Sequence, residues 1–140
     1  MPNVVIDAST IVGALLKEGS VPEQALLLAR VHDRICLSAA VEDEIREVVS
    51  RPKFRPYLRP GRIEVILTVL TEAAHVVNPT IFVTDCRDRK DNKYLELALA
   101  AAATLIISSD EDLLVLHPWR EIKIIRPVEY VRYRNNIAGL

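Results

Sequence analysis

The sequence has little cysteine, few aromatic residues and no long apolar run. Its two cysteines, Cys36 and Cys86, are too few for a disulfide scaffold or a structural zinc site. Both lie beside strand-like runs, so we expect buried thiols in a reducing compartment and a cytoplasmic protein. No apolar stretch approaches the roughly 20 residues that a membrane span requires. The start, Met1-Pro2-Asn3, lacks the basic character of a signal peptide.

An excess of charge of either sign is also missing. The chain has 18 basic and 19 acidic residues and a net charge of −1, which argues against a broadly basic coat for nucleic acid. Its 140 residues, half of them apolar, suffice for one domain with a substantial core. We therefore expect a single domain that covers residues 1–140.

The charges are unevenly distributed along the chain. Residues 1–50 hold eight acids and four bases, whereas residues 51–62 hold five bases and no acid. The five bases are Arg51, Lys53, Arg55, Arg59 and Arg62. Patches of one sign in a neutral chain can mark binding sites, and more often they are ordinary solvated faces.

Apolar periodicity predicts strands that alternate with helices. We expect strands at 4–6, 35–37, 75–77, 104–107 and 122–125. Helices are expected at 11–17 behind a Ser9 or Thr10 cap, from Pro22 onward, and at 39–49, 63–74, 91–103, 110–116 and 127–133. This alternation is typical of a mainly parallel sheet covered on both faces. The expected fold is α/β, a three-layer α/β/α sandwich around about five strands.

Acidic residues follow two of the expected strands. Asp7 ends the first strand, and Asp110 follows the fourth strand by two residues. Parallel strands place their carboxyl ends at one edge of a sheet, where sites in this fold class lie. Neighbouring carboxylates repel unless a cation lies between them, and hard cations such as Mg²⁺ prefer oxygen ligands. The pattern favours a divalent-metal site, since His32, His75 and His117 lack metal-ligand spacing.

Each acid also has an ordinary structural interpretation. Asp is a preferred N-cap residue, and Asp88, Asp91 and Asp110 all stand at expected helix starts. Asp7 differs because it ends an apolar strand, where a carboxylate without a partner is costly. A functional role is therefore favoured for Asp7, whereas capping stays open for the others.

The expected helix at 39–49 carries four acids. Asp43 and Glu47 fall on its far side, and Glu42 and Glu44 flank its apolar stripe on opposite edges. Periodicity does not choose between Glu42 and Glu44. The stripe itself comprises Val41, Ile45, Val48 and Val49.

Four stretches, taken together and in this order, resemble the PIN domain family. They are VVIDASTIVGALL, LSAAVEDEIREVVSRPKF, DRKDNKYLELALAAAATLIISSDEDLL and IKIIRPVEYV. The resemblance covers most of the chain. It is closest to the VapC-like PIN toxins of bacterial and archaeal toxin–antitoxin pairs, in which an RPKF segment follows the glutamate helix.

The resemblance implies a PIN-like fold and a metal-dependent endoribonuclease that hydrolyses RNA phosphodiester bonds with one or two Mg²⁺ or Mn²⁺ ions. The acids that match the family's catalytic and metal-binding quartet are Asp7, Glu44, Asp91 and Asp110. Asp112 matches a possible further ligand, and Ser9 and Ser108 match supporting hydroxyls. The resemblance thus selects Glu44 over Glu42.

The resemblance further implies an RNA substrate, a cognate protein antitoxin and a homodimer, with no membrane partner. The five bases of residues 51–62 are candidate RNA contacts, and Phe54 or Tyr57 is a candidate for stacking on an unpaired base. In the alternative interpretation the rings pack inward and the bases are merely solvated. The apolar helices at 11–16 and 63–74 are candidate antitoxin surfaces.

Two other functions fit part of the pattern. VVIDASTIV and SSDEDL resemble motifs of haloacid-dehalogenase-like phosphatases, but Ser9 occupies the position of their second Asp, the general acid. A non-catalytic binding module with a PIN fold is the second alternative, and the complete set of acids argues against it.

Overall fold

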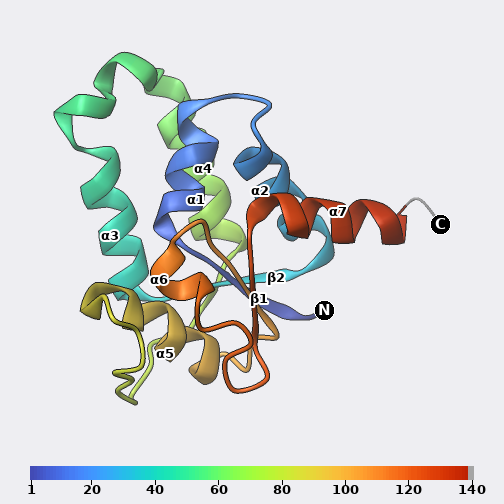
Figure 1. Cartoon of the computed structure of the whole chain (residues 1–140). Coiled ribbons are helices and arrows are strands. Elements are labelled where there is room, and N and C mark those ends of the chain that lie inside the picture. Colours follow the sequence, from blue (N-terminus) through green and yellow to red (C-terminus); the bar gives the residue numbers. More distant parts are fainter. Residues whose placement is uncertain (139–140) are drawn as a thin grey trace.

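The computed structural model describes residues 1–138, which contain a five-stranded parallel sheet (Figure 1). The strands are β1 (Asn3–Ile6), β2 (Arg34–Leu37), β3 (His75–Val76), β4 (Leu105–Ile107) and β5 (Lys123–Ile125). They lie in the order β3-β2-β1-β4-β5, and all adjacent pairs are parallel. The expected α/β class and five-stranded parallel sheet are confirmed.

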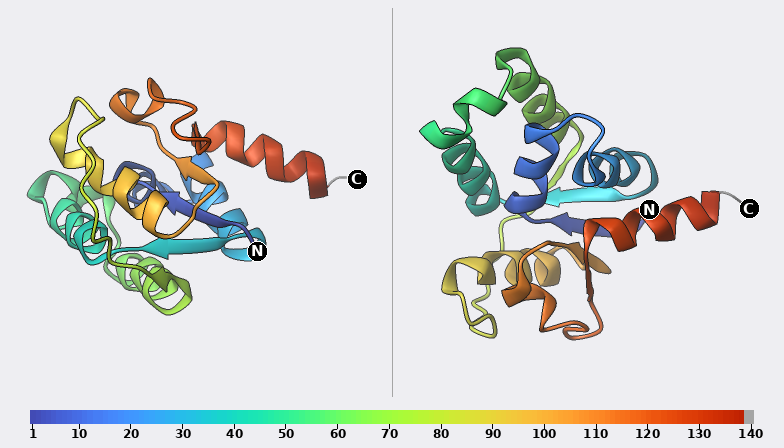
Figure 2. Two further views of the ribbon diagram at one scale, coloured as in Figure 1. Left: turned by 90° about the horizontal axis from the view of Figure 1, so that it is seen from below. Right: turned by 45° about the horizontal axis from the view of Figure 1, so that its top comes forward.

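Helices cover both sides of the strands. They are α1 (Ala8–Leu16), α2 (Val21–His32), α3 (Ala39–Val49), α4 (Pro60–Ala73), α5 (Asn92–Ala100), α6 (Glu111–Leu114) and α7 (Pro127–Ala138). In Figure 2, α1 to α4 gather on one side of β1 and β2, and α5 and α6 lie on the other. Two 3₁₀ segments, η1 (Pro52–Tyr57) and η2 (Arg89–Asp91), complete the described elements.

Several helices differ from their expected limits, since α5 ends at Ala100 rather than Ala103 and α6 ends at Leu114 rather than Leu116. The differences at α1 and α7 accompany specific side-chain contacts. α1 begins at Ala8 rather than Ile11, because Asp7 is its N-cap and accepts a hydrogen bond from the Thr10 N–H at 2.9 Å. α7 continues to Ala138 rather than ending near Tyr133. Near its middle, the Tyr130 hydroxyl and the Arg134 guanidinium both donate to Asp33, which is 3% exposed at the end of α2.

The core lies around the two central strands. Val4, Val5 and Ile6 of β1 are at most 2% exposed, and Ile106 and Ile107 of β4 are fully buried. β3 is by contrast a two-residue edge strand whose side chains are exposed.

Both cysteines are buried free thiols, as expected. Burial raises the pKa of Cys36 and of Cys86 above the ordinary thiol value. Within residues 1–138, no helix has both the length and the apolar character needed to cross a bilayer.

Candidate active site

Asp7 lies where β1 ends, at the point where the strand order reverses. Its N–H donates to the Ile107 carbonyl at 3.0 Å, and the residue is 2% exposed. Its carboxylate accepts hydrogen bonds from the Thr10 N–H and the Ser9 hydroxyl, both at 2.9 Å, and from the Ser108 hydroxyl. Burial raises the pKa of Asp7, although these hydrogen bonds act in the opposite direction.

Ser108 connects Asp7 to Asp110. Its hydroxyl donates to Asp7 and accepts a hydrogen bond from the Asp110 N–H at 3.0 Å. Asp110 is also the N-cap of α6, because its Oδ1 accepts from the Asp112 N–H at 2.9 Å. The expected cap is therefore present at Asp110, and it uses only one of the two carboxylate oxygens.

Asp91 is buried without the hydrogen bonds that a cap would make. It stands before α5, is 7% exposed, and makes no side-chain cap bond, so the capping interpretation is wrong for this residue. Its Oδ2 has no hydrogen-bond partner among the described residues. Burial raises the pKa of Asp91 to about 7, and the nearby charges of Asp110, Asp88 and Glu44 act in the same direction.

Glu44 and Glu42 point in different directions from α3. The Lys93 ammonium and the Tyr94 hydroxyl, both on α5, donate to the Glu44 carboxylate. Glu42 instead pairs with Arg46 at 2.9 Å along the surface of α3. The structure thus brings Glu44, and not Glu42, to the side of α3 that faces α5 and the other acids.

Tyr94 is a residue of the site that the sequence reasoning missed. It is 2% exposed, and its hydroxyl accepts a hydrogen bond from the Ala8 N–H at 3.0 Å while donating to Glu44. Burial and the Glu44 carboxylate raise the pKa of Tyr94, so the phenol stays protonated. A Tyr in a helix rich in Leu and Ala is typical of an apolar core position, so the sequence gives no sign of its polar contacts.

A second group of acids adjoins Asp91. Asp88, Asp91 and Asp112 each offer a carboxylate oxygen, and these atoms lie within 4.8 Å of one another. Asp88 also caps η2, through a hydrogen bond from the Lys90 N–H at 3.1 Å. The exposed Arg87 pairs with Asp112. The expected extra acid, Asp112, therefore lies beside the third acid of the predicted quartet.

The donor set fits a hard divalent cation. All of its ligand atoms are oxygens, which Mg²⁺ and similar ions prefer. The Oδ2 of Asp91 has no other partner within residues 1–138, and a buried carboxylate without a counter-charge is costly. A cation between these acids would give this oxygen a partner. It would also reduce the repulsion that, together with burial, raises the pKa of Asp91.

The basic segment 51–62 follows the C-terminal end of α3, whereas α5 lies near the opposite end of that helix (Figure 1). Arg62 makes contacts within the fold, because its guanidinium donates to Glu23 and to the carbonyls of Ala14 and Leu15. These are carbonyls of the last turn of α1, so Arg62 joins α1, α2 and α4. Its expected contact with RNA stays a prediction.

The other members of the basic segment are more exposed. Arg51 pairs with Glu47 at 2.9 Å. Lys53, Arg55 and Arg59 form no ion pair with the residues that the structure describes. Phe54 is half-buried against the core, whereas Tyr57 is 66% exposed. Within the segment, Pro52–Tyr57 form the 3₁₀ helix η1, which the sequence did not predict.

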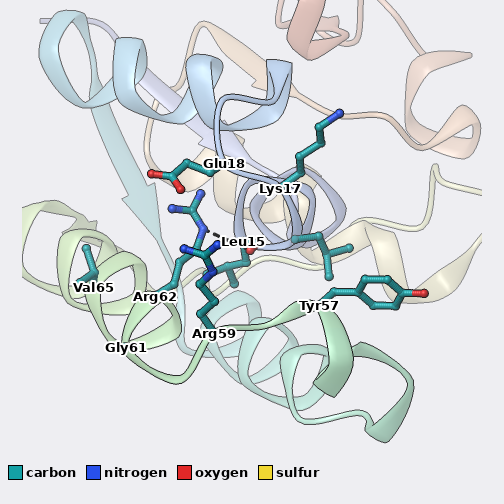
Figure 3. Close-up of a pocket in the computed structure, with 9 residues that line it drawn as sticks. Leu15, Lys17, Glu18, Tyr57, Arg59, Gly61, Arg62 and Val65 are labelled. Carbon is teal, nitrogen blue, oxygen red and sulfur yellow. Dashed lines mark hydrogen bonds between the residues drawn. The ribbon is translucent and has the colours of Figure 1, made fainter.

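An open groove of about 650 Å³ lies between the end of α1 and the start of α4 (Figure 3). Leu16, Lys17, Tyr57, Arg59 and Val65 are among its lining residues. Asp7 is at the start of α1, and the groove is at the end of that helix. At a rise of about 1.5 Å per residue, the two lie more than one helical turn apart. The groove therefore contains none of the predicted catalytic acids.

These features define an α/β protein with an acid-lined site at the carboxyl edge of a parallel sheet. The family model described as PIN domain matches residues 3–112, and the chain therefore belongs to the PIN domain family. PIN domains are generally nucleases that use divalent metal ions. This family assignment removes the basis for the haloacid-dehalogenase-like interpretation.

Two similar proteins extend the comparison. An uncharacterized protein of Methanocaldococcus jannaschii is 34% identical over 116 residues, which are 81% of this chain and 74% of the relative. The crystal structure of VapBC2 from Rickettsia felis, bound to a DNA fragment from their promoter, matches with a TM-score of 0.59. That match has 13% identity and covers 89% of this chain and 98% of the other, so it supports the fold alone.

Proposed function

We propose that this protein is an endoribonuclease that depends on Mg²⁺ or Mn²⁺ and acts as the toxin of a toxin–antitoxin pair. The observation that carries the proposal is the convergence of acids from separate elements on the buried Asp91, whose Oδ2 lacks a partner within the described chain. Membership of a family of metal-using nucleases supports the same reaction class.

The proposed catalytic residues and metal ligands are Asp7, Glu44, Asp91 and Asp110, with Asp112 as a further ligand. When bound, a divalent cation lowers the pKa of a coordinated water and stabilises charge on the attacking and leaving oxygens. Asp7 and Asp110 are assigned to direct ligation, and Ser9 and Ser108 orient the Asp7 carboxylate through their hydrogen bonds. Glu44 and Asp91 complete the ligand shell or orient the attacking water.

The reaction is hydrolysis of a phosphodiester. The water oxygen bonds to phosphorus, the bond from phosphorus to the 3′ oxygen breaks, and the released proton finishes on that oxygen. The expected products are a 5′-phosphate and a 3′-hydroxyl. A non-catalytic PIN-fold module is the competing candidate, and it would show neither Mn²⁺ binding that depends on these acids nor production of these ends.

The Asp7→Asn variant tests the proposal. Asn is about as good an N-cap as Asp, so α1 and the fold are expected to persist. Metal-dependent cleavage of single-stranded RNA should fall about 100-fold or more, and EDTA should abolish cleavage by the wild type. The exposed Asp43→Asn on α3 is the matched control and should keep wild-type activity. Undiminished cleavage by pure Asp7→Asn protein would reject the assignment.

We also propose that the basic segment contacts RNA, through Lys53, Arg55 and Arg59 and with Arg51 at its edge. These side chains are exposed, and Tyr57, which is 66% exposed, is available for stacking on an unpaired base. Arg55→Glu with Arg59→Glu should weaken cleavage and reduce the salt dependence of RNA binding by about 1.4 in log–log slope.

The matched control reverses two charges elsewhere. Arg30 and Arg132 are exposed on α2 and α7, and their change to Glu alters the net charge equally. If both double variants weaken RNA binding to the same extent, the contact is not local to the segment 51–62.

A protein antitoxin is the proposed partner, because the VapBC2 structure is a complex of such a pair by its name. Little of α1 is available as the predicted antitoxin surface, because Ile11, Ala14 and Leu15 are at most 1% exposed. The groove in Figure 3, with Val65 61% exposed on α4, is the proposed seat of an antitoxin segment.

Co-purification with the product of the adjacent reading frame tests the antitoxin, and Val65→Asp should reduce the yield of the complex. Light scattering of the isolated chain tests the proposed homodimer separately. If the isolated chain is a monomer, the proposed homodimer is rejected, and the proposed antitoxin is unaffected.

A further inference from the structure

Lys93 is a cation placed inside the acidic site. It follows Asp91 by two residues, and its ammonium group donates to the Glu44 carboxylate. The Lys93 side chain is 19% exposed and that of Glu44 is 22% exposed, so both side chains are largely shielded from water. The ammonium also lies 5.7 Å from the centre of the Tyr94 ring.

Other pairs near the site are more accessible. Arg87 pairs with Asp112, and its side chain is 64% exposed. Arg46 pairs with Glu42 on the outer side of α3, with 54% exposure. Lys93 therefore differs from Arg87 and Arg46, because its side chain is largely buried while its ammonium group contacts a predicted metal ligand.

The Glu44 carboxylate has two competing uses in this arrangement. Each of its oxygens already accepts one hydrogen bond, from Lys93 or from Tyr94, so a divalent cation bound to Glu44 would share the carboxylate charge with the ammonium group and weaken that contact. An ammonium and a divalent cation a few ångströms apart also repel each other. Lys93 has a flexible four-carbon stem that allows its charge to move to a new partner.

A phosphodiester supplies that new partner. Its non-bridging oxygens are anionic, and their charge increases as water attacks phosphorus. We propose that Lys93 exchanges partners: it neutralises Glu44 in the metal-free site and contacts a non-bridging oxygen of the scissile phosphate in the loaded site. This inference rests on the proposed nuclease function and adds a substrate-contacting residue to it.

A purely structural role for Lys93 makes a different prediction. If the pair only tethers α3 to α5, Lys93→Gln loosens the site, and both metal binding and cleavage weaken together. In the exchange account, Lys93→Gln removes a competitor for Glu44 and a contact to phosphate. Metal binding then tightens while turnover falls.

The experiment measures Mn²⁺ affinity by isothermal titration and single-turnover cleavage of a fluorescent RNA, using the full chain. For Lys93→Gln we expect the Kd for Mn²⁺ to fall about threefold or more and the cleavage rate to fall roughly 30-fold or more. Lys93→Arg, which keeps the charge, should recover part of the rate. Arg46→Gln, which breaks the exposed pair on α3, should change neither quantity.

Either of two results overturns the inference: weaker or unchanged Mn²⁺ binding by Lys93→Gln, or unchanged cleavage by it. If Lys93→Gln does not fold, the same two measurements on Lys93→Met decide. A wild type that binds Mn²⁺ and leaves RNA intact contradicts the proposed function itself. In that case the Mn²⁺ affinity of Lys93→Gln still tests the competition for Glu44.

Discussion

The carboxyl group of Asp91 is buried beside other acids without a hydrogen bond to its Oδ2 from the described residues. Asp7 is also buried, but three donors hold its carboxylate. From sequence, Asp7 and Asp110 were expected at the carboxyl edge of the sheet, and the family resemblance added Asp91. Helix capping was an open alternative for Asp91 and Asp110. Only side-chain coordinates distinguish a carboxylate that caps a helix from one that does not.

The burial of Asp91 predicts a pH effect on the stability of the metal-free protein. Its pKa is raised from 3.8 to about 7 in the fold, so this group favours folding below pH 4 and loses that contribution as pH rises toward 7. In EDTA at pH 8, Asp91→Asn should therefore be more stable than wild type, by about 1–2 kcal/mol or roughly 3–6 °C in Tm.

Thermal melts at pH 5 and pH 8 check this prediction. The advantage of Asp91→Asn should shrink at pH 5, where the wild-type carboxyl is mostly protonated in the fold. An advantage of the same size at both pH values would show that ionisation of Asp91 is not its cause.

The element α3 shows what sequence periodicity predicts and what it leaves open. The limits 39–49 and the core positions Val41, Ile45 and Val49 agree with the structure. Glu42 and Glu44 flank the same stripe, and their different roles depend on the position of α5, which is distant in sequence. The contacts of Arg62 could not be predicted for the same reason, because its partners on α1 and α2 are distant in sequence.

Arg62 should contribute more to stability than its neighbour Arg59. Arg62→Ala removes bonds to Glu23 and to two carbonyls of α1, and leaves a partly buried carboxylate without its partner. We expect a loss of about 2–3 kcal/mol in unfolding free energy, measured by urea denaturation. Arg59→Ala, at an exposed position on the same segment, should cost less than about 0.5 kcal/mol. Equal losses would contradict the proposed tether.

At the scale of the whole molecule, a net charge of −1 conceals two opposed groups of residues. Acids from β1, α3, α5 and α6 meet at one edge of the sheet, and the bases of segment 51–62 lie at the far end of α3 (Figure 1). Divalent ions at the acidic edge would reduce its repulsion toward an anionic RNA. The strand order places β1 and β4 side by side, and so brings Asp7 and Asp110 together.

Divalent cations should therefore stabilise the whole fold. Binding to the native state alone raises stability by about 2.7 kcal/mol at a ligand concentration of 100 Kd. Calorimetry with Mn²⁺ should show an increase in Tm that EDTA reverses. Asp110→Asn should lose most of this increase, whereas the exposed Asp43→Asn should keep it. The same increase in both variants would place the ions elsewhere.

We propose that the acids brought together in the fold, rather than acids in general, carry out the cleavage of RNA. Glu44→Gln and Glu42→Gln test it most directly, because they make the same chemical change two residues apart on α3. With Mg²⁺ or Mn²⁺ present, Glu44→Gln should cleave RNA about 100-fold more slowly than wild type, and Glu42→Gln should cleave at the wild-type rate. Equal rates for the two variants, or a larger loss in Glu42→Gln, would contradict the account.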